Sequence, residues 1–291
     1  MGRDKPDLEI CCGRRTDGRD NHRMRQINNM VVAITGASAG IGRALAVELS
    51  KRGARLALAA RRVDKLNELN NELGGRHLVI SCDVADADAC AAFVTQTHHH
   101  FGALDTLVCN AGYGLMRTVV ETTPAEWQAI IATNVYGTTN CIRAAVPLML
   151  KQELRDRWRG QIMIVSSCLA RRSGPDAGAY SATKAAQLSI AEALRLELDE
   201  QRIAVTSVHP IGTLSEFFDQ AEILSGRKAR RSVGEPTQTP EQVAIRMARG
   251  IEQPCVEVWP YAMSRWVFGA ATLFPKLTDG MVKRRWQRGV L

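Results

Sequence analysis

The chain alternates short apolar runs with segments of helical periodicity from Met30 onward. Several of these runs are apolar almost throughout, which is typical of strands covered on both faces of a parallel sheet. The segments between them carry apolar residues at helical spacing, as at Ile41, Leu45 and Leu49. Seven strands are predicted, at Val31–Thr35, Arg55–Ala60, His77–Cys82, Thr106–Cys109, Gln161–Ser166, Ala204–His209 and Val256–Trp259.

The repeated order of strand and helix predicts an α/β fold, a single doubly wound domain around a seven-stranded parallel sheet. Right-handed crossovers then place the ligand crevice at the carboxyl ends of the strands. We expect the catalytic domain at 30–260, with a lid over the substrate at 216–240, and a helical tail at 261–291. Residues 1–29 lack hydrophobic periodicity, so we expect a disordered arm or an extension from an upstream start codon.

Composition and charge narrow the class of protein. The chain has 291 residues, a hydrophobic content of 45% and a net charge of +8. Its apolar runs fall short of the ~18 to 20 residues that span a bilayer, so we expect a soluble, cytoplasmic protein, at most peripheral to a membrane. The eight cysteines show no metal-ligand spacing, and we expect reduced thiols and no metal site. No nucleic-acid motif accompanies the basic excess, which suits cofactor phosphates or an anionic membrane surface.

A glycine-rich loop directly follows the first predicted strand. It reads Thr35-Gly-Ala-Ser-Ala-Gly-Ile-Gly42 and opens a predicted helix. The glycines permit a tight turn and a close approach of the backbone to a pyrophosphate, which the free N–H groups of the helix N-terminus can bind. We therefore expect a dinucleotide site that includes Gly36, Ser38, Ala39, Gly40, Ile41 and Gly42.

The end of the second predicted strand bears on the choice of nicotinamide cofactor. An acidic residue there holds the ribose 2′-hydroxyl of NAD, whereas a basic residue accommodates the 2′-phosphate of NADP. The chain has Ala60 where the acid is expected, followed by Arg61 and Arg62. Because a guanidinium binds phosphate through paired, charge-assisted hydrogen bonds, the sequence favours NADP(H) over NAD(H). The alternative is a solvated pair of arginines at a helix entrance.

Tyr180 and Lys184 are the candidate centre of the chemistry. They stand four residues apart, so on a helix both side chains lie on one face. An ammonium about 6 Å from the phenol favours the phenolate by about 2 to 3 kcal/mol at an effective dielectric of about 20. The pair therefore predicts a lowered tyrosine pKa and a usable general acid/base. A packed tyrosine beside a solvated lysine is the alternative that the pair alone leaves open.

Five features together resemble the short-chain dehydrogenase/reductase family, in its single-domain branch, over about residues 30 to 220. The family's order and spacing are matched by the glycine loop at 35–42, Asp83-Val84 after the third strand, the stretch from Phe101 to Gly112, Asn134 in Thr133-Asn-Val-Tyr-Gly137, and Ser167 with Tyr180 and Lys184. Cys109 stands where the family often has a further asparagine.

The resemblance implies a role for each of these residues. Tyr180 would exchange a proton with the substrate oxygen, and Ser167 would hydrogen-bond the same oxygen. Lys184 would lower the Tyr180 pKa and bond the nicotinamide ribose, while Asn134 would fix a water that links Lys184 to solvent. Hydride would pass directly to or from the nicotinamide. Further cofactor contacts would come from Asp83 and Val84 at the adenine and from Asn110, Ala111 and Gly112 beside the adenosine ribose.

The loop after the sixth strand departs from the family pattern P-G-x-V-x-T. The chain has Pro210-Ile-Gly-Thr-Leu-Ser215, so Ile211 replaces the glycine and Ser215 takes the hydroxyl position that would meet the nicotinamide carboxamide. We expect Pro210 and Ser215 to contact the cofactor. The lid that follows offers an apolar wall and so suggests a lipophilic substrate, through Phe217, Phe218, Ile223 and Leu224.

The expected tail interleaves aromatic and basic residues. They are Trp259, Trp266, Phe268, Phe274 and Trp286 with Arg265, Lys276, Lys283, Arg284, Arg285 and Arg288. This pattern suits an anchor on anionic lipid, and it equally suits a helix packed on its own protein or on a second subunit of a homo-oligomer, either a dimer or a tetramer.

The sequence as a whole predicts an NADP(H)-dependent oxidoreductase that interconverts a small-molecule ketone or aldehyde and an alcohol. Reduction of a lipophilic carbonyl is the favoured direction. The alternative is an NADP(H)-binding regulator that keeps the fold and has lost turnover. Nucleic acid is not an expected partner.

Overall fold

The sheet sets the architecture of the protein. The computed structural model describes residues 24–226 and 237–287, and its seven strands pair in parallel in the order β3-β2-β1-β4-β5-β6-β7. The strands are β1 (Val31–Thr35), β2 (Arg55–Ala60), β3 (Leu78–Ser81), β4 (Thr106–Cys109), β5 (Gly160–Val165), β6 (Ile203–Val208) and β7 (Glu257–Val258). The strand order reverses between β1 and β4, which is where a doubly wound sheet opens its ligand crevice.

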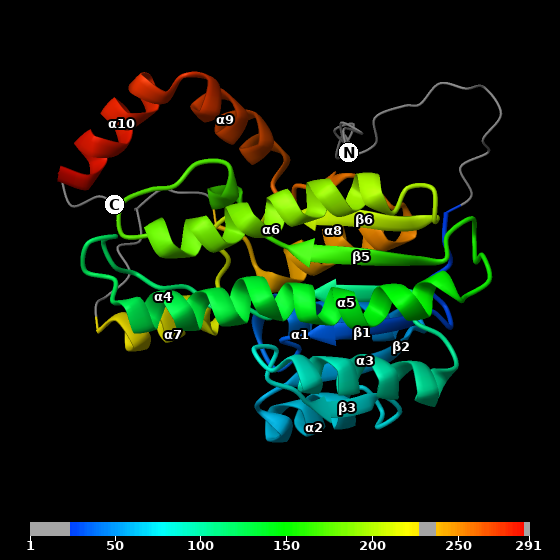
Figure 1. Cartoon of the computed structure of the whole chain (residues 1–291). Coiled ribbons are helices and arrows are strands. Elements are labelled where there is room, and N and C mark those ends of the chain that lie inside the picture. The colour runs from blue at the N-terminus through cyan, green and yellow to red at the C-terminus, as the bar shows by residue number, and fades with distance from the viewer. Residues whose placement is uncertain (1–23, 227–236, 288–291) are drawn as a thin grey trace, which may run out of the picture.

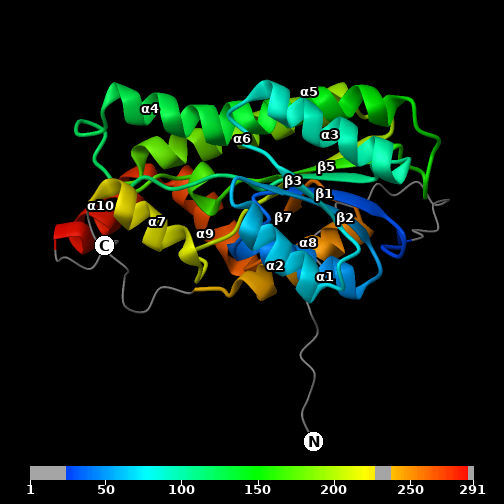
Figure 2. The ribbon, with the colours of Figure 1, turned by 90° about the horizontal axis from the view of Figure 1, so that it is seen from below.

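Helices cover both faces of the sheet (Figures 1 and 2). They are α1 (Gly40–Lys51), α2 (Val63–Glu72), α3 (Ala87–Phe101), α4 (Pro124–Ile131), α5 (Gly137–Leu150), α6 (Gly178–Glu197), α7 (Glu216–Ser225), α8 (Pro240–Glu252), α9 (Ala262–Leu273) and α10 (Pro275–Gln287). One core cluster joins the sheet to α1, α2 and α8, and a second joins it to α3, α5 and α6. The doubly wound, single-domain α/β fold is confirmed.

The predicted strands agree with the structure within a residue or two at each end. β1, β2 and β4 match their predicted bounds, while β3 is one residue shorter at each end. β7 is limited to two residues because only Ser207 and Val208 of β6 pair with it. Local hydrophobicity predicts an apolar run, but the neighbouring strand decides how much of that run is hydrogen-bonded.

Part of the segment expected to be disordered is packed into the fold. Residues 1–23 lie outside the described residues, but residues 24–29 pack near the amino ends of β4 and β5, and Arg25 and Ile27 are buried there. The Arg25 guanidinium donates to Gln161 Oε1 at 2.9 Å and to the Asp105 carbonyl at 3.1 Å. The packed part of the chain therefore includes residues before the expected boundary at residue 29. The partners of Arg25 lie far along the chain, so the local sequence gives no signal of this packing.

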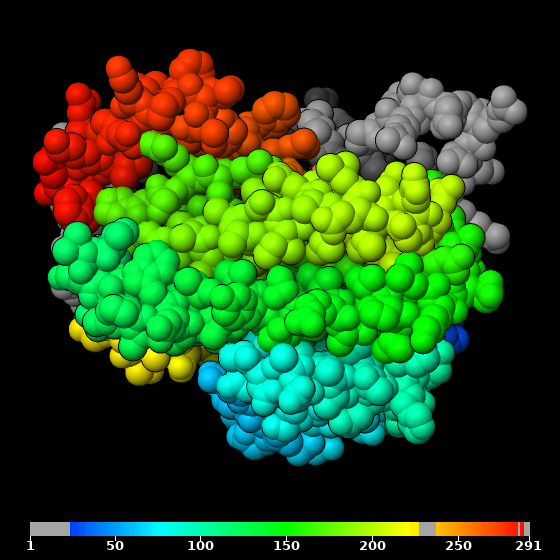
Figure 3. Space-filling view, in the orientation of Figure 1, coloured from blue at the N-terminus to red at the C-terminus, as the bar shows by residue number. Residues whose placement is uncertain are grey.

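The lid and the tail both contain helices. α7 and the start of α8 account for the described part of the expected lid at 216–240, and residues 227–236 of that lid lie outside the described residues. The tail forms α9 and α10, with α9 against the short 3₁₀ turn at Cys168–Ala170. In the space-filling view the tail forms a raised ridge along one end of the molecule (Figure 3). Within the described residues, no helix is long and apolar enough to cross a membrane.

Candidate active site

A pocket of about 1960 Å³ opens at the carboxyl ends of the strands. Its walls come from the loops that follow β1 to β6, together with α7 and the tail. Of the expected site residues, Asn134 and Gly42 are buried and do not line the wall. The pocket brings together Gly36, Ser38, Ala39, Gly40, Ile41, Arg61, Arg62, Asp83, Val84, Asn110, Ala111, Gly112, Ser167, Tyr180, Lys184, Pro210 and Ser215.

The glycine loop presents an open helix end to this pocket. Gly36 and Gly40 have φ of +66° and +55°, a backbone conformation that glycine adopts without strain. α1 begins after Ala39, which supplies no side-chain cap, and its first turn contains no acidic residue. By contrast, α4 and α8 close their N-termini with capping boxes. The free N–H groups of α1 and their positive potential therefore fit the pyrophosphate of a dinucleotide.

Asn110 fixes the shape of the loop from the end of β4. Its Nδ2 donates to the carbonyl oxygens of Thr35 at 2.9 Å and Gly36 at 3.2 Å. In return, the Thr35 hydroxyl accepts from the backbone N–H groups of Asn110 at 3.0 Å and Ala111 at 3.1 Å. The asparagine expected beside the adenosine ribose thus braces β1 against β4 across the crevice.

Arginines stand at the rim of the pocket beyond β2. Arg62 donates to Ser38 Oγ at 3.2 Å and forms an exposed ion pair with Glu216 at 3.0 Å. Arg61 is exposed beside it, and no acidic residue replaces Ala60 at the strand end. A phosphate at this rim would meet both guanidinium groups, but it would also meet the Glu216 carboxylate at the start of α7.

Asp83 and Val84 lie on the adjacent side of the same rim, after β3. Asp83 Oδ1 accepts from the Ala85 N–H at 3.1 Å, which shapes the turn. Val84 packs closely on Gly137 at the start of α5, where an added Cβ would lie 2.8 Å from Val84 Cβ. Val84 gives this side of the rim an apolar side chain, which suits a planar base.

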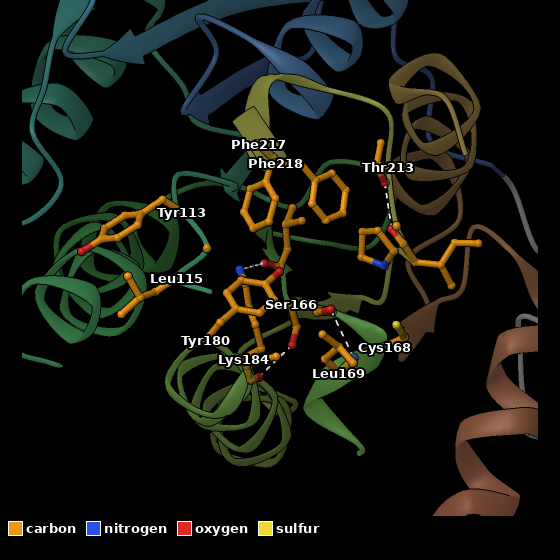
Figure 4. A pocket seen from close by; sticks show the side chains of 18 of the residues that line it. Tyr113, Leu115, Ser166, Cys168, Leu169, Tyr180, Lys184, Thr213, Phe217 and Phe218 are labelled. Carbon is orange, nitrogen blue, oxygen red and sulfur yellow. Dashed lines mark hydrogen bonds between the residues drawn. The ribbon is translucent and has the colours of Figure 1, made fainter. Parts of the chain in front are cut away.

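Tyr180 lies in the pocket wall and faces α7 (Figure 4). Burial raises the pKa of its phenol above the usual range, although a hydrogen bond with Ser167 acts in the opposite direction. The expected lowering of this pKa by Lys184 is therefore wrong for this structure. The expected proximity does hold, because Lys184 Nζ lies 5.6 Å from the centre of the Tyr180 ring.

Lys184 explains why the phenol is not made more acidic. Its side chain is buried, 4% exposed, and burial lowers its pKa to about 7. Burial therefore makes the charged form of Lys184 less favourable than in water, which weakens its effect on Tyr180. Its hydrogen bonds run to the Val165 carbonyl at 2.8 Å and to Gln187 Oε1 at 2.8 Å.

Asn134 lies in a π-helical turn, Ala132–Tyr136, between α4 and α5. The turn buries its side chain, whose amide holds the Tyr113 backbone through two 3.0 Å hydrogen bonds and donates to Thr183 Oγ1 at 2.9 Å. Its backbone carbonyl accepts from Gln187 Nε2 at 2.8 Å. Asn134 thus connects the loop after β4 to α6, from one layer behind the pocket wall.

The loop after β6 reaches back over the site. The Pro210 carbonyl accepts from Cys168 N–H at 3.0 Å, which ties the loop to the residue after Ser167. Ser215 is the N-cap of α7, and its Oγ accepts from Phe217 N–H at 3.4 Å. An added Cβ on Gly40 would lie 3.4 Å from Ser215 Cβ, so the serine stands close to the glycine loop.

α7 and the tail make the outer part of the pocket apolar. The Phe217 ring packs edge-on against Tyr180, with 5.4 Å between ring centroids, and Phe218 packs against Phe217 (Figure 4). Leu224 also lines the pocket, whereas Ile223 is exposed and does not, because it lies on the outer side of α7. The tail adds apolar residues to the opposite side, among them Val267, Phe268, Ala271, Phe274, Leu277 and Met281.

Two buried polar residues next to this site were not predicted from the sequence. Gln187 contacts Lys184 and Asn134, and His209 contacts the backbone carbonyl of Ser167 through Nδ1 at 3.2 Å. Gln187 follows Lys184 by three residues, so it shares a helix face with it, and that spacing was a usable signal. His209 is within the predicted sixth strand, but its contact with Ser167 depends on strand pairing.

An open dinucleotide loop and a tyrosine, lysine and serine around one pocket are typical of NAD(P)-dependent oxidoreductases. The family model for short chain dehydrogenases matches residues 30–223, and the protein belongs to this family. It is therefore an oxidoreductase that binds NAD(P)(H) and acts on CH–OH groups or the corresponding carbonyls.

Curated relatives support the same family. The chain is 33% identical over 268 residues to "11-beta-hydroxysteroid dehydrogenase-like 2" of Arabidopsis thaliana, covering 87% of this chain and 80% of the relative. It is 32% identical to "Glycine betaine reductase ATRR" of Emericella nidulans, covering 78% of this chain but only 18% of that much longer protein.

Solved structures show the same fold. A short chain dehydrogenase/reductase from Burkholderia phymatum, in complex with NAD, superposes with a TM-score of 0.78 at 21% identity, covering 88% of this chain and 97% of that one. The 3-ketoacyl-(acyl-carrier-protein) reductase from Brucella melitensis, complexed with NADH, gives a TM-score of 0.69 at 24% identity, covering 80% and 97%.

Proposed function

We propose that this protein is an NADP(H)-dependent reductase of a lipophilic ketone or aldehyde, with Tyr180 as the general acid. The observation that carries the proposal is the meeting of Tyr180, Ser167 and Lys184 at the floor of a pocket whose outer walls are apolar. The cofactor, when bound, supplies hydride from its nicotinamide to the carbonyl carbon. The raised pKa keeps the Tyr180 phenol protonated at neutral pH, as a proton donor must be.

The residues of the chain have distinct tasks in this proposal. Tyr180 Oη gives its proton to the substrate oxygen, and the Ser167 hydroxyl hydrogen-bonds that oxygen as negative charge develops on it. Lys184, when protonated, stabilises the phenolate that Tyr180 becomes. Asn134 has a structural task, because its side-chain amide hydrogen-bonds the backbone of Tyr113 and so holds the loop after β4 in place. Phe217 shields the Tyr180 ring from water on the side of α7.

The preference for NADP(H) rests on Arg61, Arg62 and the absence of an acid at position 60. Two guanidinium groups at one rim fit a 2′-phosphate, whereas a 2′-hydroxyl leaves their charge unused. The Glu216 carboxylate works against this preference, because it neutralises Arg62 at 3.0 Å. Since that pair is exposed, we expect phosphate to displace the carboxylate at a cost of about 1 kcal/mol or less.

The substrate class is inferred from the outer pocket. Phe217, Phe218 and Leu224 on one side and the tail helices on the other offer a largely apolar surface to the part of the substrate distant from the carbonyl. Removing such surface from water stabilises a complex by about 25 cal/mol per Å². A carbonyl compound with a bulky hydrocarbon body fits this wall better than a small polar one.

The tail also suggests how the protein associates with other surfaces. Its outward side exposes large apolar residues, among them Met263, Trp266 and Leu273, next to Arg265 and Lys276. Contact with a second copy of the chain in a homo-oligomer is the first interpretation, and peripheral contact with a membrane is the second. Truncation after Pro260 distinguishes them, because it changes either the oligomeric state or the pelleting with liposomes.

The function is tested with a panel of carbonyl compounds that increase in hydrocarbon size. The loss of NADPH absorbance measures the rate of reduction of each compound. We expect turnover that rises with the size of the apolar body and is faster with NADPH than with NADH at equal, subsaturating concentrations. NADPH binding without turnover over the whole panel would instead favour the regulator that keeps the fold. Equal rates with both cofactors would refute the cofactor preference.

A further inference from the structure

Gln187 is a fully buried polar residue whose amide oxygen and amide nitrogen are both hydrogen-bonded. It lies on α6, one turn after Lys184, and is 0% exposed. Its Oε1 accepts from Lys184 Nζ at 2.8 Å, and its Nε2 donates to the Asn134 carbonyl and to Thr138 Oγ1, both at 2.8 Å. Burying an amide costs free energy unless it is hydrogen-bonded, so this residue is held in one orientation.

That orientation is fixed by the neighbours of the amide. Because Asn134 offers a carbonyl, it can only accept, so the NH₂ side of Gln187 must face it and Oε1 must face Lys184. Thr138 Oγ1 in turn donates to the same Asn134 carbonyl at 2.9 Å, which leaves it free to accept from Gln187. The oxygen of the amide is therefore always presented to the ammonium.

We propose that Gln187 is the positioning residue for Lys184, holding its ammonium in place and favouring its charged form through a direct amide link to the Asn134 carbonyl. The Gln187 side chain joins Lys184 to the Asn134 carbonyl directly through its own amide. A carboxamide accepts a hydrogen bond without exchanging protons near neutral pH. The link therefore orients Lys184 and does not carry protons away from it.

Gln187 is the side chain that is placed to influence the position and the pKa of the Lys184 ammonium. The ammonium has two acceptors, Gln187 Oε1 and the Val165 carbonyl of β5. Among titratable groups, Tyr180 lies on the same helix with its ring centre 5.6 Å from Lys184 Nζ, and Tyr113 and Cys168 line the same pocket. Burial alone lowers the pKa of Lys184, with no contribution from a charged group among the described residues.

The catalytic meaning of this inference rests on the proposed function, but its test does not. The pKa of Lys184 is measured directly by NMR titration of ¹³C-labelled lysine in the intact protein, with the resonance assigned from Lys184→Met. Gln187→Glu places a carboxylate against the ammonium, and we expect the Lys184 pKa to rise by about one unit. Gln187→Leu removes one of its two acceptors, and we expect that pKa to fall.

A matched control is available at Gln161, near the other end of β5. This glutamine is also 0% exposed, and its Nε2 also donates to a carbonyl, of Gly250 at 2.9 Å, and to a threonine hydroxyl, of Thr206 at 3.1 Å. Its Oε1 accepts from a buried cation, Arg25 at 2.9 Å, as Gln187 Oε1 accepts from Lys184, so Gln161→Glu makes a matched change without facing Lys184. We expect it to leave the Lys184 pKa unchanged, and thermal unfolding of all variants identifies any that fail to fold.

Opposite shifts in Gln187→Glu and Gln187→Leu support the inference, since a purely structural role would not reverse sign. If Gln187→Glu does not fold, the downward shift in Gln187→Leu carries the test. An unchanged Lys184 pKa in the folded Gln187 variants, or an equal shift in Gln161→Glu, overturns it. Where the wild type reduces a carbonyl, the basic limb of its kcat/KM profile should move with the Lys184 pKa. Opposite NMR shifts without turnover would refute the proposed function and leave the role of Gln187 intact.

Discussion

Gly42 offers the sharpest test of how the fold builds its cofactor loop. A Cβ at this position would overlap the Gly36 carbonyl oxygen and lie 2.5 Å from Asn110 Nδ2. The Gly36 carbonyl is backbone and cannot rotate away, so Gly42→Ala must displace the loop. Overpacking of this kind costs about 1 to 3 kcal/mol.

The hydrogen bonds of Asn110 add to that cost. Its amide donates to the carbonyls of Thr35 and Gly36, and the displaced loop loses at least one of these bonds, worth about 1 kcal/mol. The smaller backbone entropy of alanine in a helix returns about 0.5 to 1 kcal/mol. We therefore expect the free energy of unfolding to fall by about 1 to 3 kcal/mol and cofactor affinity to fall about tenfold or more.

The assays are urea denaturation and titration of NADPH fluorescence. Gly269→Ala in α9 is the matched control, because no atom lies within 4 Å of the added Cβ and the helix gains stability of about 0.5 to 1 kcal/mol. Gly42→Ala with wild-type stability and wild-type NADPH affinity would refute the reasoning about the loop.

Three further predictions concern charge, the tail and pH. Arg61→Ala should raise the Kd for NADPH by about tenfold and leave the Kd for NADH nearly unchanged, and equal losses would exclude a 2′-phosphate role. Truncation after Pro260 should slow reduction of large apolar carbonyls more than small ones, measured as kcat/KM, and a uniform change would argue against a tail-lined substrate pocket. Burial lowers the pKa of His77 to about 4, below its ordinary value of 6.5, so its neutral form is the stabilising one. Stability should therefore be lost as pH falls from 6.5 toward 4, by up to about 3 kcal/mol, and His77→Gln should flatten this dependence in urea titrations; an identical pH dependence in the variant would contradict it.

Much of the fold could be predicted from local pattern. Apolar runs such as Val31–Thr35 and Arg55–Ala60 are strands with the predicted bounds, since both faces of each are covered by helices. The glycine loop and the pairing of Tyr180 with Lys184 depend on short sequence spacing, which secondary structure translates directly into proximity. These features therefore lie together in one pocket as expected.

The rest depends on contacts between distant segments. Arg25 has polar partners more than 75 residues away, at Asp105 and Gln161, so composition alone assigned it to a disordered arm. The direction of the Tyr180 pKa was wrong because the Coulomb argument assumed a fully charged lysine near a solvated phenol. Both groups are buried, and burial favours their neutral forms. The packing of α6 on its neighbours determines this burial, and a four-residue spacing in the sequence does not predict it.

Tyr180→Phe removes the hydroxyl that would donate the proton in the proposed NADPH-dependent carbonyl reduction. A single-turnover experiment with NADPH bound and the best carbonyl of the panel separates chemistry from cofactor binding. We expect the chemical step to slow at least about 100-fold, because a positioned general acid is lost, and the Kd for NADPH to change by less than about threefold. A Tyr180→Phe variant that reduces the carbonyl at the wild-type rate would contradict this role of Tyr180.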